Sequence, residues 1–143
     1  MPIDCAFNGC DKLIETVNGV GYVDKWVVSC DKSVTKVELK ADTVGIAGWA
    51  FETCSSLTEV TISQSVKSIC DSAFRYCSSL MKITIPDSVT SVGEEAFYYC
   101  FKLTDINYNG SMEEWKNMED GKNLRYQTGN YVVHCTDGDI KKS

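Results

Sequence analysis

Apolar and small residues recur along this chain at fixed positions, with a period of 23 residues. Ala50, Ala73 and Ala96 each begin the pattern Ala-Phe-x-x-Cys-x-x-Leu, and the leucine is followed by x-x-Val/Ile-x and a further apolar residue. The positions marked x vary in polarity and charge from copy to copy. Such a period is typical of a repeat protein, in which one unit stacks on copies of itself because a single unit cannot bury its apolar side alone.

Each copy predicts one short strand and one tight turn. The alternation after the leucine, as in 82–85 (KITI), favours a half-buried strand, and its β-branched residues support this interpretation. The spacing of three in Ala-Phe-x-x-Cys-x-x-Leu favours one helical or 3₁₀ turn. The sequence therefore predicts an α/β fold, a solenoid of 23-residue coils with short parallel strands and short helical or 3₁₀ turns.

The limits of the period divide the chain. A broken copy, Ala6-Phe7-x-x-Cys10-x-x-Leu13, opens the sequence. Nothing before Ile3 shields its apolar residues, so we expect either a fragment of a longer array or a homodimer joined through the N-terminal ends. We predict a single solenoid domain over 1–143, made of a partial repeat (1–17), an irregular insertion with a hairpin (18–43), regular repeats (44–108) and a C-terminal cap (109–143).

Two local signals refine the insertion and the cap. Within 20–30, two apolar and aromatic runs flank an Asp-Lys dipeptide, which predicts a β-hairpin. Ser111 and Glu114 form a capping-box pattern ahead of a predicted helix at 112–118. We expect Trp115 of this helix to cover the open end of the last coil.

Composition and charge narrow the class of partner. The net charge of −6 argues against a nucleic-acid-binding surface, which needs clustered basic residues. No apolar run approaches the ~20 residues of a membrane span, so we expect no membrane insertion. The first residues lack the basic and apolar regions of a signal peptide, so either the protein stays inside the cell or the chain is a piece of a longer one.

Cysteine recurs in every copy, and the chain holds eight cysteines. The column of Cys54, Cys77 and Cys100 runs along the stacking axis, whereas a metal site needs converging ligands, and no Cys-x-x-Cys pair is present. Cysteine is among the most buried residue types, so we expect these three to be reduced thiols packed in the core. Four further cysteines fall outside the column, and their redox state stays open: Cys5, Cys30, Cys70 and Cys135.

His134 and Cys135 form the one adjacent thiol–imidazole pair in the sequence, in a predicted strand at 131–135. Adjacent strand residues point to opposite faces of a sheet, so we expect no catalytic pair here. The segment 136–139 (TDGD) lacks the full spacing and distal glutamate of a calcium loop, so we expect a turn. The sequence thus indicates no catalytic residue, no metal site and no cofactor.

The segment from Leu80 to Leu103 reads Leu-x-x-Ile-x-Ile-Pro-x-Ser-Val-x-x-Val-Gly-x-x-Ala-Phe-x-x-Cys-x-x-Leu. This pattern resembles the BspA-type leucine-rich repeats of bacterial surface proteins. The resemblance implies a right-handed solenoid with parallel strands on its concave side and a C-terminal end-cap. It also implies a cell-surface or secreted protein that binds host or matrix proteins. The chain departs from the pattern where Ala47 and Cys70 replace the usual glycine and Ser63 the usual proline.

These observations favour a binding module over an enzyme. We expect a non-enzymatic interaction or adhesion module that recognises a protein or a glycan. The alternative is a structural spacer whose repeats hold a neighbouring domain without a ligand of their own. A thiol-dependent enzyme is the remote alternative.

The candidate ligand-binding residues lie in three groups. Two polar columns are predicted in register on the exposed face of the strands: Glu59, Lys82 and Asp105, and beside them Thr61, Thr84 and Asn107. These columns contain no aromatic residue, whereas binding hot spots favour Trp, Tyr and Arg. Tyrosines beside the cysteine column are the better aromatic candidates: Tyr76, Tyr98 and Tyr99.

Overall fold

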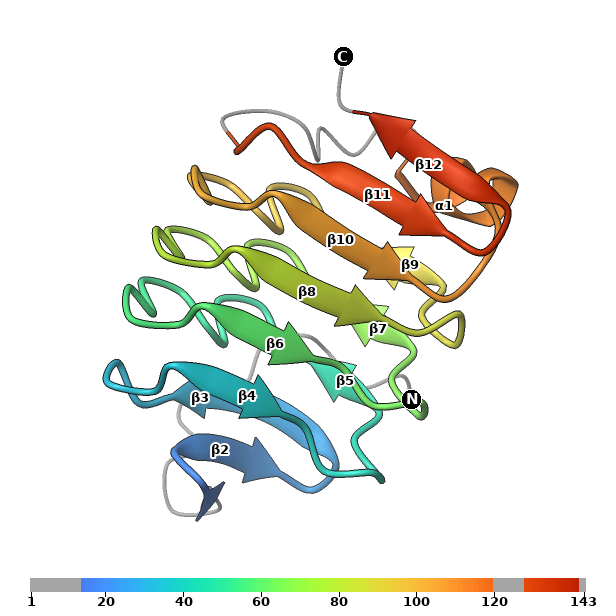
Figure 1. The fold of residues 1–143 in the computed structure, drawn as a ribbon. Coiled ribbons are helices and arrows are strands. Elements are labelled where there is room, and N and C mark those ends of the chain that lie inside the picture. Colours follow the sequence, from blue (N-terminus) through green and yellow to red (C-terminus); the bar gives the residue numbers. More distant parts are fainter. Residues whose placement is uncertain (1–13, 120–127, 142–143) are drawn as a thin grey trace.

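The two passes of each coil form two separate sheets (Figure 1). The computed structural model describes residues 14–119 and 128–141. The sheet that contains the alternating strand of each regular repeat, called here the main sheet, has the order β12-β11-β10-β8-β6-β4. Its strands are β4 (Lys36–Glu38), β6 (Glu59–Thr61), β8 (Lys82–Ile85), β10 (Asp105–Tyr108), β11 (Val132–Cys135) and β12 (Gly138–Lys141).

The second sheet, called here the short sheet, takes the return pass of each coil. Its order is β1-β2-β3-β5-β7-β9. Its strands are β1 (Glu15–Val17), β2 (Val20–Val23), β3 (Trp26–Cys30), β5 (Gly45–Ile46), β7 (Ser68–Ile69) and β9 (Ser91–Val92). The predicted solenoid of about 23 residues per coil is therefore confirmed, while its right-handed sense stays a prediction.

The register of both sheets follows the sequence period. In the main sheet, Val60 pairs with Ile83 and Ile83 with Ile106, all in parallel strands. In the short sheet, Ile46 pairs with Ile69 in the same way. Each step moves one coil along the stack, so residues of one sequence column become spatial neighbours.

The core lies between the two sheets and consists of these columns. The rings of Phe51 and Phe74 stack with centroids 4.9 Å apart, and those of Phe74 and Phe97 stack at 5.8 Å. The leucine, valine and isoleucine columns are also buried, including Leu57, Leu80 and Leu103. Burying a Leu or Phe side chain contributes about 1.5–3 kcal/mol, so the repeated columns are the main source of stability.

The tight turns of the repeats are not helical. Cys54 N–H donates to the Phe51 carbonyl at 3.1 Å, and Leu57 N–H donates to Cys54 at 3.2 Å, so each turn is closed by a bond between residues three apart. Between these bonds, Thr53 has a left-handed φ of 60°. That residue breaks the run of right-handed dihedrals that a helix needs. In the described part of the chain, the helix is α1 (Met112–Glu119) alone.

The insertion contains the predicted hairpin, because β2 and β3 pair antiparallel with Val23 opposite Trp26. Strand β1 also pairs antiparallel with β2, so the end of the predicted partial repeat is not arranged as a repeat strand. Phe7, Cys10 and Leu13 of that partial repeat lie outside the described residues, as does the surface predicted to form a homodimer. The domain limits therefore stay predictions.

The C-terminal elements extend the main sheet. Strand β11 pairs parallel with β10, and β12 returns antiparallel beside it. The capping box at the start of α1 is present: Ser111 N–H donates to Glu114 Oε1 at 2.9 Å, and Glu114 N–H donates to Ser111 Oγ at 3.1 Å. Trp115 is buried and packs on Tyr108. Helix α1 is far too short to cross a membrane, and no other helix in the described ranges is a candidate for a span.

Candidate functional site

The cysteine column makes thiol hydrogen bonds to the neighbouring coil. Cys77 Sγ donates to the Phe51 carbonyl at 3.1 Å, and Cys100 Sγ donates to the Phe74 carbonyl at 3.0 Å. Both residues are fully buried, and both are free thiols. A hydrogen bond with the Cys100 thiol, together with burial, holds the pKa of Cys77 far above its ordinary value. The Cys77 thiol therefore stays protonated and packs as an apolar group with a weak donor.

Two of the cysteines predicted outside the column, Cys30 and Cys70, make contacts that the sequence did not predict. Cys30 lies next to Cys54 in space, because Cys54 Sγ approaches the Cys30 carbonyl oxygen at 3.9 Å. This carbonyl takes the place that the Phe51 carbonyl has for Cys77. The insertion of β2 and β3 hides this relation from the sequence period. Cys70 is disulfide-bonded.

The adjacent pair His134 and Cys135 is separated as predicted. Cys135 packs against the hydrophobic core. The His134 ring lies instead on the outer face of the main sheet, where it bonds to carboxylates. The two side chains therefore point to opposite faces of β11, and they do not form a thiol–imidazole pair.

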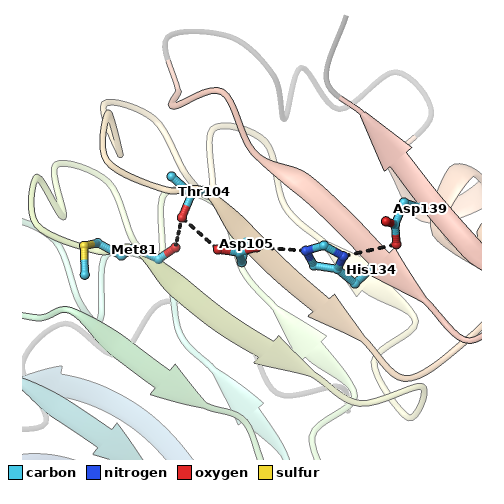
Figure 2. Close-up of polar contacts among 5 residues, drawn as sticks. All are labelled: Met81, Thr104, Asp105, His134 and Asp139. Carbon is cyan, nitrogen blue, oxygen red and sulfur yellow. Dashed lines mark hydrogen bonds and ion pairs between the residues drawn. The ribbon is translucent and has the colours of Figure 1, made fainter.

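His134 lies between two aspartates, an arrangement called here the histidine clasp (Figure 2). Its Nε2 atom is 2.8 Å from Asp105 Oδ1 on β10, and its Nδ1 atom is 3.1 Å from Asp139 Oδ1 on β12. Thr104 Oγ1 lies 2.9 Å from Asp105 Oδ2 and 3.2 Å from the Met81 carbonyl oxygen. The clasp thus joins the last regular coil to both C-terminal strands.

The electrostatics of the clasp favour a protonated His134 and an ionised Asp105. The hydrogen bond to Asp105 raises the pKa of His134, and Asp139 adds to the shift. The bond from His134, followed by that from Thr104, lowers the pKa of Asp105. Both ring nitrogens face a carboxylate, so no lone pair is left for a base or a metal. Within 14–119 and 128–141, no group of three His, Cys, Asp or Glu residues is arranged to hold a metal ion.

The predicted strand columns lie in register on the outer face of the main sheet. Glu59 pairs with Lys82, and Lys82 pairs with Asp105, which confirms the alternating charges. Lys36 on β4 extends this charge ladder by one step. The second column follows beside it: Thr61, Thr84 and Asn107. A hollow of about 370 Å³ at the β4 end is lined by Glu59 and Thr61, among others.

The predicted tyrosines lie together at the turns that precede the main-sheet strands. Tyr76 and Tyr99 stack with centroids 4.8 Å apart, and Tyr98 lies 4.3 Å from Tyr99. Two further residues complete what is called here the aromatic cluster. Phe101 lies 5.0 Å from Tyr99, and the Arg75 guanidinium lies 5.0 Å from the Tyr76 ring centroid and 5.2 Å from that of Tyr98.

The cluster is partly exposed and rests on a hydrogen-bonded backbone. The exposed fraction is 38% for Tyr76 and 54% for Phe101. Tyr76 and Tyr99 have φ angles of 62° and 61°, a left-handed conformation that bulky residues rarely adopt. An inter-coil hydrogen bond holds this conformation at Tyr76, whose N–H donates to the Tyr98 carbonyl at 2.8 Å. The rings are therefore displayed by a rigid ladder rather than by a loose loop.

Sequence reasoning found the tyrosines of this cluster but missed Arg75 and Phe101. One signal was available for Phe101, because the other copies carry Ser55 and Ser78 at that position. An apolar residue at a position that is polar in the other copies indicates a surface contact rather than a place in the core. No comparable signal exists for Arg75, since its column also holds Glu52 and varies in charge.

Comparison with known families and structures agrees with this fold. A model described as the BspA type leucine rich repeat region matches in six copies over residues 4–119. A comparison with curated proteins finds no match. A leucine-rich repeat protein from Bacteroides capillosus is 22% identical with a TM-score of 0.69, and the match covers 86% of this chain and 98% of that one.

Two other solved structures are longer than this chain. The leucine-rich repeat protein of T. pallidum is 26% identical with a TM-score of 0.54, over 62% of this chain and 47% of that chain. The pneumococcal vaccine antigen PcpA is 15% identical with a TM-score of 0.63, over 73% of this chain and 33% of that chain. The match thus spans less than half of either protein.

Proposed function

The chain belongs to the BspA-type leucine-rich repeat family, and from this premise we propose that it is a non-enzymatic interaction module that binds a protein through its aromatic cluster. We further propose that it is part of a cell-surface or secreted protein and that its partner is a host or matrix protein. Family membership supports the localisation, since this repeat type is generally found in bacterial surface or secreted proteins.

The observation that carries the proposal is the aromatic cluster, in which Tyr76 and Phe101 are exposed and the other three members are half-buried: Arg75, Tyr98 and Tyr99. Tyr and Arg are the residue types enriched at binding hot spots. Rings that already stack on one another lose little conformational freedom on binding, so the ordering cost of an interface is reduced. The guanidinium over two of the rings keeps N–H donors available for a carboxylate or carbonyl of the partner.

The outer face of the main sheet supports binding less well. Its columns alternate in charge, from Lys36 through Glu59 and Lys82 to Asp105, and hold no aromatic residue. Exposed ion pairs contribute little free energy and are screened by salt. We therefore propose that this face fixes the strand register and keeps the outer surface of the sheet polar. We assign recognition of the partner to the aromatic cluster.

The test uses substitutions that the backbone tolerates. Asn adopts left-handed φ more readily than other non-glycine residues, so Tyr76→Asn and Tyr99→Asn should remove the rings without unfolding the turns. Trp49→Asn is the matched control, because Trp49 is 54% exposed with a φ of 59° but makes no ring contact with the cluster.

Immobilised wild-type and variant chains are incubated with purified matrix proteins and with serum proteins, and the retained proteins are quantified. We expect at least one protein to be retained by the wild type and by Trp49→Asn, and to be lost with the double tyrosine variant. Equal retention by all three chains would refute binding through the cluster. No specific retention by the wild type would favour the structural-spacer alternative.

A further inference from the structure

A second polar pocket lies at the opposite end of the main-sheet strands from the aromatic cluster. It has a volume of about 220 Å³ and lies between the corner that follows β8 and helix α1. Its apolar walls are Val89 and Met118. Asp87 from the corner and Glu114 from the helix bring two carboxylates to it. No residue of the aromatic cluster takes part, so this pocket is independent of the proposed protein-binding surface.

Tyr108 of β10 supplies the observation that points to a ligand. Only 2% of this residue is exposed, yet it lines the pocket. Its hydroxyl makes no hydrogen bond to the described residues and is not enclosed by the protein, so it can bond to a group that enters the pocket. Gly110 passes close to the hydroxyl, since a Cβ atom there would lie 2.8 Å from it. The phenol is therefore held at the base of the pocket with its oxygen unpaired.

The charges around this hydroxyl are negative. Burial raises the pKa of Tyr108, and the carboxylates of Glu114 and Asp87 raise it further. Oε1 of Glu114 accepts the capping bond from Ser111 N–H, which leaves Oε2 for another donor. No Lys or Arg lines the pocket among the residues that the structure describes. The pocket thus holds negative charge that no cation of its own wall neutralises.

We propose that this pocket binds a primary ammonium group on an aliphatic stem, the chemistry of a lysine side chain or of a free alkylamine. Oxygens of Asp87, Glu114 and Tyr108 come from three different elements, which suits the three divergent N–H donors of an ammonium better than the planar fork of a guanidinium. Val89 and Met118 contact the methylene groups of the stem. The volume is below that of pockets for drug-sized ligands and fits one side chain.

The test is a titration with n-pentylamine, followed through the backbone amide signals of Asp87, Val89 and Asn117 by NMR. 1-Pentanol has the same stem without the charge and serves as the matched ligand control. We expect millimolar binding of pentylamine at the pocket and at least tenfold weaker binding of pentanol. Equal shifts with both ligands would show that only the apolar wall is used and would overturn the proposal.

Substitutions test whether each of the three oxygen-bearing side chains contributes to amine binding. We expect Asp87→Asn and Glu114→Gln each to weaken pentylamine binding about tenfold, and Tyr108→Phe about threefold to tenfold, as for hydrogen bonds to charged groups. The Gln retains a carbonyl oxygen for the capping bond, and the Phe retains the buried ring, so both variants should fold. Glu113→Gln removes the same charge from the exposed neighbour of Glu114 and should leave binding unchanged. Unaltered binding in the three pocket variants would refute the site.

A second titration distinguishes the sources of the ammonium. Nα-acetyl-lysine amide represents a lysine within a polypeptide, and Nα-acetyl-arginine amide carries the alternative cation. Tighter binding of the lysine amide than of pentylamine would assign the pocket to a protein partner, and the reverse would assign it to a free amine. Tighter binding of the arginine amide than of both would contradict the choice of an ammonium.

Discussion

The imidazole of His134 on β11 bonds to the carboxylate of Asp105 on β10, with 2.8 Å between Nε2 and Oδ1. The bond crosses the junction between the last regular coil and the C-terminal strands, and Asp139 completes it from the far side (Figure 2). A neutral imidazole donates from one nitrogen only, so both contacts are satisfied at once when the ring is protonated. The clasp is therefore a junction whose strength depends on pH.

Stability should decrease as pH rises through the folded-state pKa of His134. That pKa is raised above its ordinary 6.5, so the clasp contribution is fully present below pH 6.5 and is lost above the raised value. The pKa of Asp105 is lowered below 3.8, so its contribution is present above pH 3.8 and is lost as pH falls further. We expect His134→Gln to destabilise the chain by about 0.5–1 kcal/mol between these limits, because exposed pairs contribute little.

The measurement is urea unfolding of the wild type and His134→Gln from pH 3 to pH 9. Thr84→Ser on the same sheet face is the control, since it carries no titrating group. The difference between wild type and His134→Gln should shrink at both ends of the pH range. A difference that is constant over the whole range would contradict a charged clasp.

The column assignment predicts that substitutions at two nearby positions of one repeat have unequal costs in stability. Leu80→Ala should destabilise the chain by about 2–5 kcal/mol, because it leaves a cavity between the sheets where the side chain is fully buried. Lys82→Ala, two residues further on the exposed face, should cost less than ~1 kcal/mol. Urea melts of both variants give the comparison. Similar costs at the two positions would show that the inward and outward columns are wrongly assigned.

The thiols of the cysteine column should react slowly with thiol reagents in the folded protein. Cys54, Cys77 and Cys100 are fully buried, so we expect a maleimide reagent to label them slowly in native buffer and rapidly in urea. Cys135 is half-buried and serves as the internal comparison, with faster native labelling. Mass spectrometry of peptides after timed labelling measures each site. Fast native labelling of the three column thiols would refute their burial.

The period in the sequence predicted the stack and its register, because burial of a repeated apolar side admits few arrangements. Ile83 lies opposite Ile106 for the same reason that the two align in sequence. The left-handed residues in the turns were not predictable by spacing. Positive φ at Thr53 depends on inter-coil bonds such as that from its N–H to the Arg75 carbonyl at 2.8 Å, which no local pattern encodes.

The same limit applies to the candidate sites. The charge ladder was predictable, because its members share one sequence column. The histidine clasp joins Asp105 to His134 across elements that do not share the period, so its geometry depends on how β11 docks. The proximity of Cys30 to Cys54 was also hidden, because the hairpin changes the local spacing. Contacts between residues of the regular repeats could be predicted from the sequence. Contacts at the two ends of the repeat array could not.

The charge ladder makes a prediction about register that can be tested by reversing one charge. Lys82 stands between Glu59 and Asp105, and its charge helps to lower the pKa of Asp105. Lys82→Glu would place three negative side chains side by side on adjacent strands. Like charges directly opposite destabilise a sheet, so we expect a loss of about 1 kcal/mol, against a smaller loss for Lys82→Gln.

Salt separates this effect from a change in strand propensity. Screening between exposed charges has a range of about 3 Å in 1 M salt, so most of the added cost of Lys82→Glu over Lys82→Gln should disappear there. The triple variant Lys36→Glu, Glu59→Lys and Lys82→Glu restores opposite charges across β4, β6 and β8 and should recover part of the loss at low salt. A cost of Lys82→Glu that neither salt nor the triple variant reduces would mean that Lys82 does not face these carboxylates in solution.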